Sequence, residues 1–248
     1  KNENILRVGM ECGYAPFNWF QSNDKNGAVK TDGGYCGGYD VEIAKIIAKE
    51  LGRELVIVKS EWDALLGPAL TSGKIDINVA GMSATPERKQ SLLFSHPYYD
   101  SDLVLVVKKD GKYTNAKTIN DFSGARITAQ LNTLHYTVID QMKGIIKQPA
   151  MENFPSMIVA LNSNKIDGYI SERPGAMAAQ LSNPNLTFIS FNKETGFKYE
   201  TDEVYVSVGM KLGNDELAEK INKILDGITP EQKLKIMEEA VKNQPLQQ

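Results

Sequence analysis

Short β-type runs alternate with helical patterns along the first hundred residues, and this alternation limits the possible folds more than any other feature. Residues 5–9, 55–58 and 75–80 have the length and apolar character of strands, whereas residues 41–51 and 62–71 have helical patterns. Neighbouring parallel strands need a crossover, and a helix between each pair supplies one. The sequence therefore predicts an α/β fold whose parallel sheet is built with right-handed crossovers.

The pattern starts again after residue 108. The expected elements of this second α/β unit are strands at 126–130, 166–170 and 186–191 and helices at 133–143, 155–161 and 176–181. A strand at 204–210 and helices at 215–225 and 230–242 follow. Residues 10–38, rich in glycine, asparagine, aspartate and tyrosine, are expected to form a long loop.

Two extended apolar segments lie at the boundaries between these units. Residues 103–108 and 204–210 are expected to be two hinge-connecting strands, with the C-terminal helices returning to the first unit. The predicted domains are lobe 1, formed by residues 1–102 and 206–248, and lobe 2, formed by residues 103–205.

Composition excludes several classes of protein. The net charge is −3, so the chain has no electrostatic footprint for nucleic acid, and we expect none as a partner. The longest aliphatic run, residues 103–107, is too short to span a bilayer. The opening residues show no signal-peptide pattern, so we expect either a cytoplasmic protein or a mature exported form. Cys12 and Cys36 are either two reduced thiols or one disulfide.

Residues 81–88 directly follow the third predicted strand. Thr85 is a good N-cap and Pro86 a good first helical residue, so a helix is expected to start here. The carboxyl end of a parallel strand is where α/β sheets bind ligands. Ser83 adds a hydroxyl, and the Arg88 guanidinium can bind a carboxylate with two hydrogen bonds. The alternative is an ordinary helix cap with a surface arginine.

Aromatic and acidic residues follow the first two strands at the same predicted edge. Glu11, Tyr14, Phe17 and Trp19 lie just past the first strand, and Trp62 opens the helix after the second. Such a group can hold a cation or an aliphatic stem between rings. The alternative is that Tyr14 and Trp62 are half-buried packing residues.

The second unit offers two further groups. Thr133 follows a strand and opens a helix, and Glu172 follows the strand at 166–170. With Arg88 and Glu11, they complement an α-amino acid zwitterion, although two carboxylates could also serve an enzyme as acid and base. His96 and His135 stand alone, and no activated nucleophile or cofactor motif occurs. We therefore expect no enzyme activity, no cofactor and no metal.

Motifs throughout the chain resemble those of polar amino-acid-binding proteins, the solute receptors of ABC importers. The matching segments are residues 7–17, 38–43, 62–66, 73–76, 81–89, 94–95, 98–99 and 166–169. They occur in the family's order over nearly the whole length, and the lysine/arginine/ornithine and glutamine receptors are the most similar patterns. The resemblance implies a two-lobed periplasmic-binding-protein-like fold of type II.

The resemblance also implies a role for each candidate residue. Arg88 would bind the ligand α-carboxylate, aided by Ser83 and the backbone N–H of Thr133. Glu172 and the Gly81 carbonyl would bind the α-ammonium group. Tyr14 and Trp62 would sandwich the ligand side chain, and Glu11 would reach its distal end.

Three departures from the family pattern concern this site. Glu11 and Glu172 stand where these relatives usually have aspartate, which moves each carboxylate one methylene further. Leu131 and Asn132 replace the usual glycine-containing turn before Thr133, and the 21–38 loop is longer.

The resulting hypothesis is a receptor that captures a polar, basic amino acid, arginine or lysine, and delivers it to an ABC permease by hinge closure. Glutamine or another polar amino acid is the alternative ligand. A dehydratase-like enzyme and an extracellular sensor domain on the same scaffold are the alternative functions. We expect a monomer that works in the periplasm or as a cell-surface lipoprotein.

Overall fold

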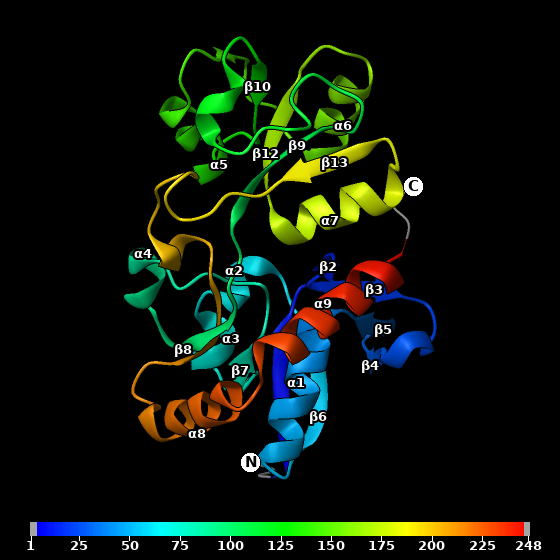
Figure 1. Ribbon diagram of the computed structural model, residues 1–248. Helices are drawn as coiled ribbons and strands as arrows, with labels where there is room; N and C mark the ends of the chain where they lie inside the picture. The colour runs from blue at the N-terminus through cyan, green and yellow to red at the C-terminus, as the bar shows by residue number, and fades with distance from the viewer. Residues whose placement is uncertain (1–3, 246–248) are drawn as a thin grey trace. The chain divides into compact units, whose positions relative to one another are not determined.

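The computed structural model of the chain describes residues 4–245, which form two units. The first contains the chain up to Asp100 and again from Val204, and the second contains Ser101–Glu203. Each unit has its own five-stranded sheet covered by helices (Figure 1). The chain therefore passes between the units twice.

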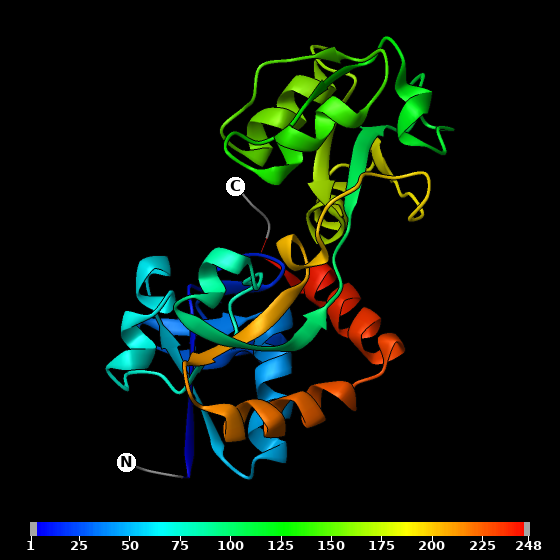
Figure 2. The same ribbon diagram turned by 90° about the vertical axis from the view of Figure 1, so that its left-hand side faces the viewer.

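The sheet of the first unit is mixed rather than all parallel. Its strands, in spatial order, are β6 (Glu54–Lys59), β1 (Ile5–Met10), β7 (Ile77–Asn78), β14 (Val206–Lys211) and β8 (Leu92–Tyr99). The first three are parallel, as the alternation predicts. β14 pairs antiparallel with both β7 and β8, and Figure 2 shows β14 and β8 side by side. β8 is not among the strands predicted from the sequence.

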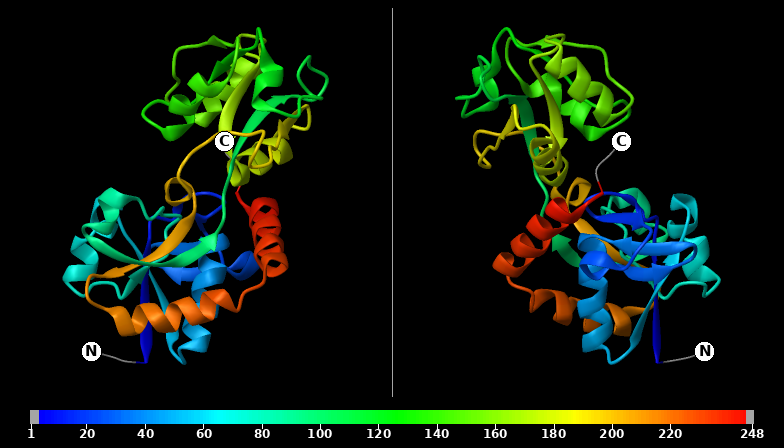
Figure 3. Two further views of the ribbon diagram at one scale, coloured as in Figure 1. Left: turned by 60° about the vertical axis from the view of Figure 1, so that its left-hand side comes forward. Right: turned by 90° about the vertical axis from the view of Figure 1, so that its right-hand side faces the viewer.

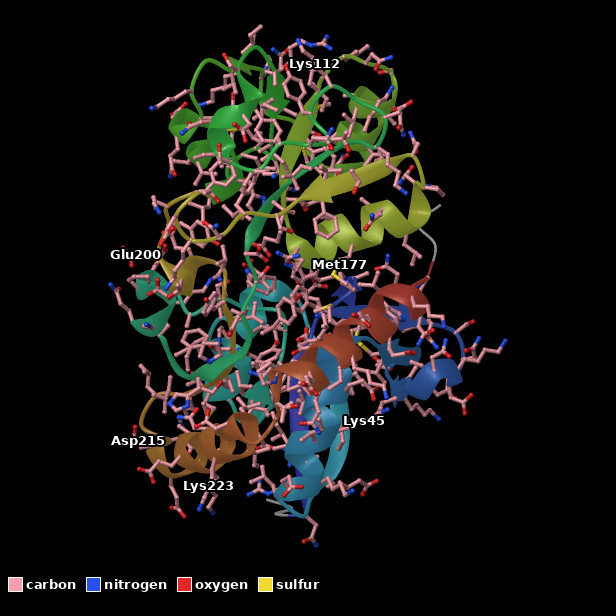
Figure 4. The ribbon with its side chains drawn as sticks, viewed as in Figure 1. Lys45, Lys112, Met177, Glu200, Asp215 and Lys223 are labelled. Carbon is pink, nitrogen blue, oxygen red and sulfur yellow. A yellow bond between two sulfur atoms is a disulfide. The ribbon has the colours of Figure 1, made fainter. Side chains whose placement is uncertain are left out.

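Three long helices flank this sheet: α1 (Tyr39–Glu50), α8 (Asp215–Asp226) and α9 (Pro230–Asn243). α8 packs on β8, and both C-terminal helices contact α1, as Figure 3 shows. Their outer faces are charged; Figure 4 shows Lys45 on α1 and Lys223 on α8, and Lys45 pairs with Glu42 at 2.9 Å. Within residues 4–245, no helix combines the length and apolar character needed to cross a membrane.

The helix predicted at 62–71 is two short helices, α2 (Trp62–Leu65) and α3 (Pro68–Thr71). Pro68 has no backbone N–H and its ring blocks a continuing helix, so the chain turns at Gly67 and starts again. α4 (Pro86–Lys89) begins where the sequence predicts, with the Thr85 hydroxyl accepting from the Arg88 N–H at 3.3 Å.

The prediction of a long loop at residues 10–38 is wrong, because this segment forms a small antiparallel sheet. Its strands, in spatial order, are β2 (Gly13–Tyr14), β3 (Asn18–Gln21), β5 (Gly34–Gly37) and β4 (Val29–Thr31), with the short helix η1 (Lys25–Gly27) between β3 and β4. Strands of two to four residues are too short to show a clear alternating pattern, so they escape sequence analysis.

The second unit contains a mixed sheet in the order β11 (Ile146–Lys147), β10 (Arg126–Thr128), β12 (Gly168–Glu172), β9 (Leu103–Lys108) and β13 (Leu186–Ile189). β9 lies antiparallel to both neighbours. The helical elements are α5 (Leu134–Thr137), α6 (Phe154–Asn162), α7 (Arg173–Ser182), η2 (Ile119–Phe122), η3 (Val138–Gln141) and η4 (Thr201–Glu203). A core that includes Val104, Met157 and Tyr169 joins the sheet to α6 and α7.

Candidate functional site

The candidate residues of the first unit lie at one edge of its sheet. β6, β1 and β7 are parallel neighbours, so their carboxyl ends meet at that edge. Glu11 follows β1, Trp62 follows β6, and Gly81 and Ser83 follow β7. Two backbone bonds hold the strand ends together: the Ser60 N–H donates to the Met10 carbonyl and the Val79 N–H to that of Gly9.

Arg88 is the cation of this edge. Its Nη1 donates to the Ser83 carbonyl at 3.0 Å, and its guanidinium carbon lies 5.3 Å from the centre of the Trp62 ring. Burial lowers the pKa of Arg88, while the charges of Glu87 and Tyr14 raise it in part. A partly buried guanidinium over an aromatic face is held in place and poised to bind an anion.

Tyr14 packs against the backbone at Gly81. The Tyr14 ring stacks on Phe17 with 5.3 Å between centroids. A Cβ atom at position 81 would come within 2.8 Å of the Tyr14 Cε2 atom, and the Gly81 φ is +60°. Glycine is required here both by the close approach and by the left-handed backbone, so the Tyr14 ring can lie directly against the Gly81 backbone.

Two carboxylates, Glu11 and Glu61, lie at the same edge, and only Glu11 is a candidate from the sequence. Burial raises the pKa of Glu11, and the negative charge of Glu61 raises it further. Glu61 is the N-cap residue of α2, directly before Trp62. Its position next to a candidate aromatic residue is the signal that could have revealed it. Together the two side chains make this end of the edge acidic.

A disulfide between Cys12 and Cys36 fixes the segment that carries Glu11 and Tyr14, with 5.7 Å between the Cα atoms. It settles the choice that the sequence left open, since no free cysteine occurs and the chain has only these two. Cys12 has a φ of 57°, which turns the chain sharply between the end of β1 and β2. The bridge links that turn to β5.

Thr133 and Glu172 both lie in the second unit. Thr133 is the N-cap residue of α5, and its hydroxyl donates to the Gln130 carbonyl at 2.7 Å. Asn132 before it has a φ of 59°, a conformation that asparagine tolerates better than most residues. This explains how the turn forms without the glycine that the family pattern has there.

Glu172 ends β12, and its Oε1 lies 3.3 Å from the Nε2 atom of His135. The sequence predicts His135 to stand alone, without a polar partner. His135 is buried, and its Nδ1 has no hydrogen-bond partner among the described residues. The two residues are 37 positions apart in sequence, so only the fold brings them together.

A two-unit α/β chain with a cation, carboxylates and aromatic rings at a sheet edge has the features of a solute-binding protein. Residues 6–241 match the bacterial extracellular solute-binding proteins, family 3, and the chain belongs to this family. The resemblance is confirmed, and the structural neighbours confirm the type II fold. Members of this family are solute-binding receptors that work outside the cytoplasm.

Three relatives illustrate the similarity. The probable histidine-binding protein of Campylobacter jejuni is 35% identical over 203 residues, covering 80% of this chain and 72% of the relative. An amino acid ABC transporter substrate-binding protein from Streptococcus pneumoniae, solved bound to L-arginine, has a TM-score of 0.65 and 26% identity, covering 97% and 95% of the two chains. An ancestral arginine-binding protein, solved bound to glutamine, has a TM-score of 0.59 and 30% identity, covering 95% and 96%.

Proposed function

We propose that this protein captures an L-amino acid with a cationic side chain, arginine or lysine, and delivers it to an ABC permease. The observation that carries the proposal is the pair of carboxylates, Glu11 after β1 and Glu61 before α2, at the same edge. Burial raises the pKa of Glu11, and repulsion by the negative charge of Glu61 raises it further. A cation bound beside them would relieve that repulsion, whereas an acidic side chain would add to it. The Trp62 and Tyr14 rings would hold the aliphatic stem.

The α-carboxylate of the ligand would bind Arg88 and Ser83. A guanidinium carries five N–H donors, so Arg88 can keep its bond to the Ser83 carbonyl and still bind a carboxylate. The α-ammonium group would bind the Gly81 carbonyl. We extend the proposal to the second unit, where Glu172 would add a carboxylate for the ammonium and Thr133 a backbone N–H for the carboxylate.

Glutamine is the second candidate ligand. One relative is named for histidine and another was solved bound to L-arginine, but an ancestral arginine-binding protein has also been solved with glutamine. A carboxylate such as Glu11 accepts hydrogen bonds from an amide as well as from a cation. The charge of the side-chain slot is what separates the two ligands.

We propose that the protein is a monomeric receptor rather than an enzyme, and that it works in the periplasm or as a cell-surface lipoprotein. The Cys12–Cys36 disulfide supports this location, because disulfides persist in oxidising compartments outside the cytoplasm. Arg88, Glu11 and Glu172 are complementary to the charges of a basic amino acid, which supports binding of the ligand rather than its chemical conversion.

Calorimetric titration with arginine, lysine, histidine, glutamine and glutamate tests the proposal. Arginine or lysine should bind most tightly and glutamate should not bind. Glu11→Gln should weaken the basic ligands tenfold or more, which is about 1.4 kcal/mol, and leave glutamine nearly unchanged. Glu54→Gln, at the opposite end of β6 and exposed, is the matched control. Preference for glutamine by the wild type, or basic ligands untouched by Glu11→Gln, would contradict the cationic slot.

A further inference from the structure

We infer that Asp40 is a positioning residue for the amino-acid site, holding the Tyr14 segment through Asn18 and the Gly81 backbone through Tyr98. The inference rests on the proposed function, since Tyr14 and Gly81 are both proposed to contact the ligand. Asp40 itself is fully buried in the first turn of α1.

Each oxygen of the Asp40 carboxylate accepts one hydrogen bond from a side chain. The Asn18 Nδ2 group donates to Oδ2 at 2.9 Å, and the Tyr98 hydroxyl donates to Oδ1. Asp40 stands in the first turn of α1, yet the N-cap position of that helix is Gly38, which has no capping side chain. The carboxylate is therefore engaged in long-range contacts, to residues 22 and 58 positions away, rather than in local capping.

Two chains of hydrogen bonds, called relays below, start at Asp40. The first relay runs through Asn18 to the backbone of the strand that carries Tyr14. Asn18 Oδ1 accepts from the Gly13 N–H at 3.1 Å, while its Nδ2 group donates to Asp40. Asn18 also pairs with Tyr14 across β2 and β3. Because the amide of Asn18 is used at both ends, Asp40 sets which way the amide points and so where the Gly13 backbone is held.

The second relay runs to Gly81. The Tyr98 hydroxyl accepts from the Gly81 N–H at 3.2 Å and donates its own proton to Asp40. Tyr39 secures Tyr98 from the other side, stacking on its ring at 6.0 Å and donating to its backbone carbonyl at 2.6 Å. Fixing the Gly81 N–H fixes the peptide plane next to the carbonyl that is proposed to bind the ligand ammonium.

Counting donors shows why a carboxylate is needed at this position. Both partners, the Tyr98 hydroxyl and the Asn18 Nδ2 group, are donors, so both Asp40 oxygens must accept. An asparagine at position 40 would offer one acceptor and one donor, and the donor would face either Asn18 or Tyr98. With its Nδ2 group towards Asn18, Asp40→Asn places two donors face to face and breaks the first relay. With its Nδ2 group towards Tyr98, the Tyr98 hydroxyl must accept, and the proton of that hydroxyl loses its acceptor at position 40.

Amide signals and affinities measured together test the inference. In protein labelled with ¹⁵N-glycine at pH 8, Tyr98→Phe should move the Gly81 amide signal and leave that of Gly13 in place. Asn18→Ala should do the reverse. Each variant should weaken arginine binding about tenfold by calorimetry. The matched control is Thr31→Val, which removes a buried hydrogen bond of the same unit, from the Thr31 hydroxyl to the Ile57 carbonyl at 3.0 Å. It should leave both amides and the affinity unchanged.

Several outcomes would overturn the inference. Arginine binding within twofold of wild type in both Tyr98→Phe and Asn18→Ala would do so, as would glycine signals that move no differently from those of Thr31→Val. If Asp40→Asn does not fold, these two single-relay variants still decide the matter. If the wild type binds no amino acid, the proposed function fails, while the amide signals still show whether the two relays exist.

Discussion

Asp40 should make the stability of the first unit depend on pH, and Asp40→Asn should remove that dependence. Burial raises the pKa of the Asp40 carboxyl to about 7, and its hydrogen bonds from Tyr98, Asn18 and the Gly81 backbone only partly oppose the rise. In the unfolded chain the same group titrates near 3.8. Between those two values the folded state keeps a proton that the unfolded state has lost.

The sign and the size of the effect follow from this difference. Stability contributed by the proton is fully present below about pH 3.8, falls as the pH rises towards 7 and is gone above it. A difference of this size corresponds to about 4 kcal/mol across the window, since one pKa unit is 1.36 kcal/mol. The asparagine variant does not titrate, so its own pH dependence should lack this contribution.

Urea unfolding followed by tryptophan fluorescence measures the effect, because both tryptophans, Trp19 and Trp62, lie in the first unit. The free energy of unfolding of wild type minus that of Asp40→Asn should become less favourable to the wild type from pH 4 to pH 7. It should then be level from pH 7.5 to pH 9. Other carboxylates titrate in both proteins and cancel in the difference. A difference that is constant from pH 4 to pH 9 would refute the reasoning.

Three further predictions concern the ligand site and the disulfide. Arg88→Ala should weaken arginine binding by about 2–5 kcal/mol in calorimetry, whereas Arg53→Ala, at the far end of β6, should have no effect; a loss below threefold for Arg88→Ala would contradict the assignment. Replacing Cys12 and Cys36 by serine should lower the free energy of unfolding by about 3 kcal/mol in urea titrations, because the bridge closes a loop across a separation of 24 residues. Equal unfolding midpoints with and without the bridge would argue against this stabilisation. Saturating arginine should reduce the radius of gyration in small-angle scattering, because both units are proposed to contribute groups to one ligand. The far-ultraviolet circular dichroism should stay unchanged. An unchanged scattering profile would count against the proposal that both units bind the ligand.

The sequence by itself indicated the features that depend on local pattern. The parallel strands β1, β6 and β7 and the long helices α1, α8 and α9 follow from apolar periodicity, and the start of α4 at Pro86 follows from the capping hydroxyl of Thr85. The edge of the first sheet that carries Glu11, Trp62 and Gly81 also follows, because parallel strands with helical crossovers place their carboxyl ends together.

Only the tertiary structure decided the features that depend on contacts between distant residues. The small sheet within residues 10–38 arises from strands of two to four residues that are stable only when paired, with a disulfide joining Cys12 to β5. The partners of Asp40 are Asn18, 22 residues earlier, and Tyr98, 58 residues later, and no local pattern signals either contact. Sequence periodicity reports which face of an element is apolar, but which buried polar groups satisfy one another is determined by the packing of those faces in three dimensions.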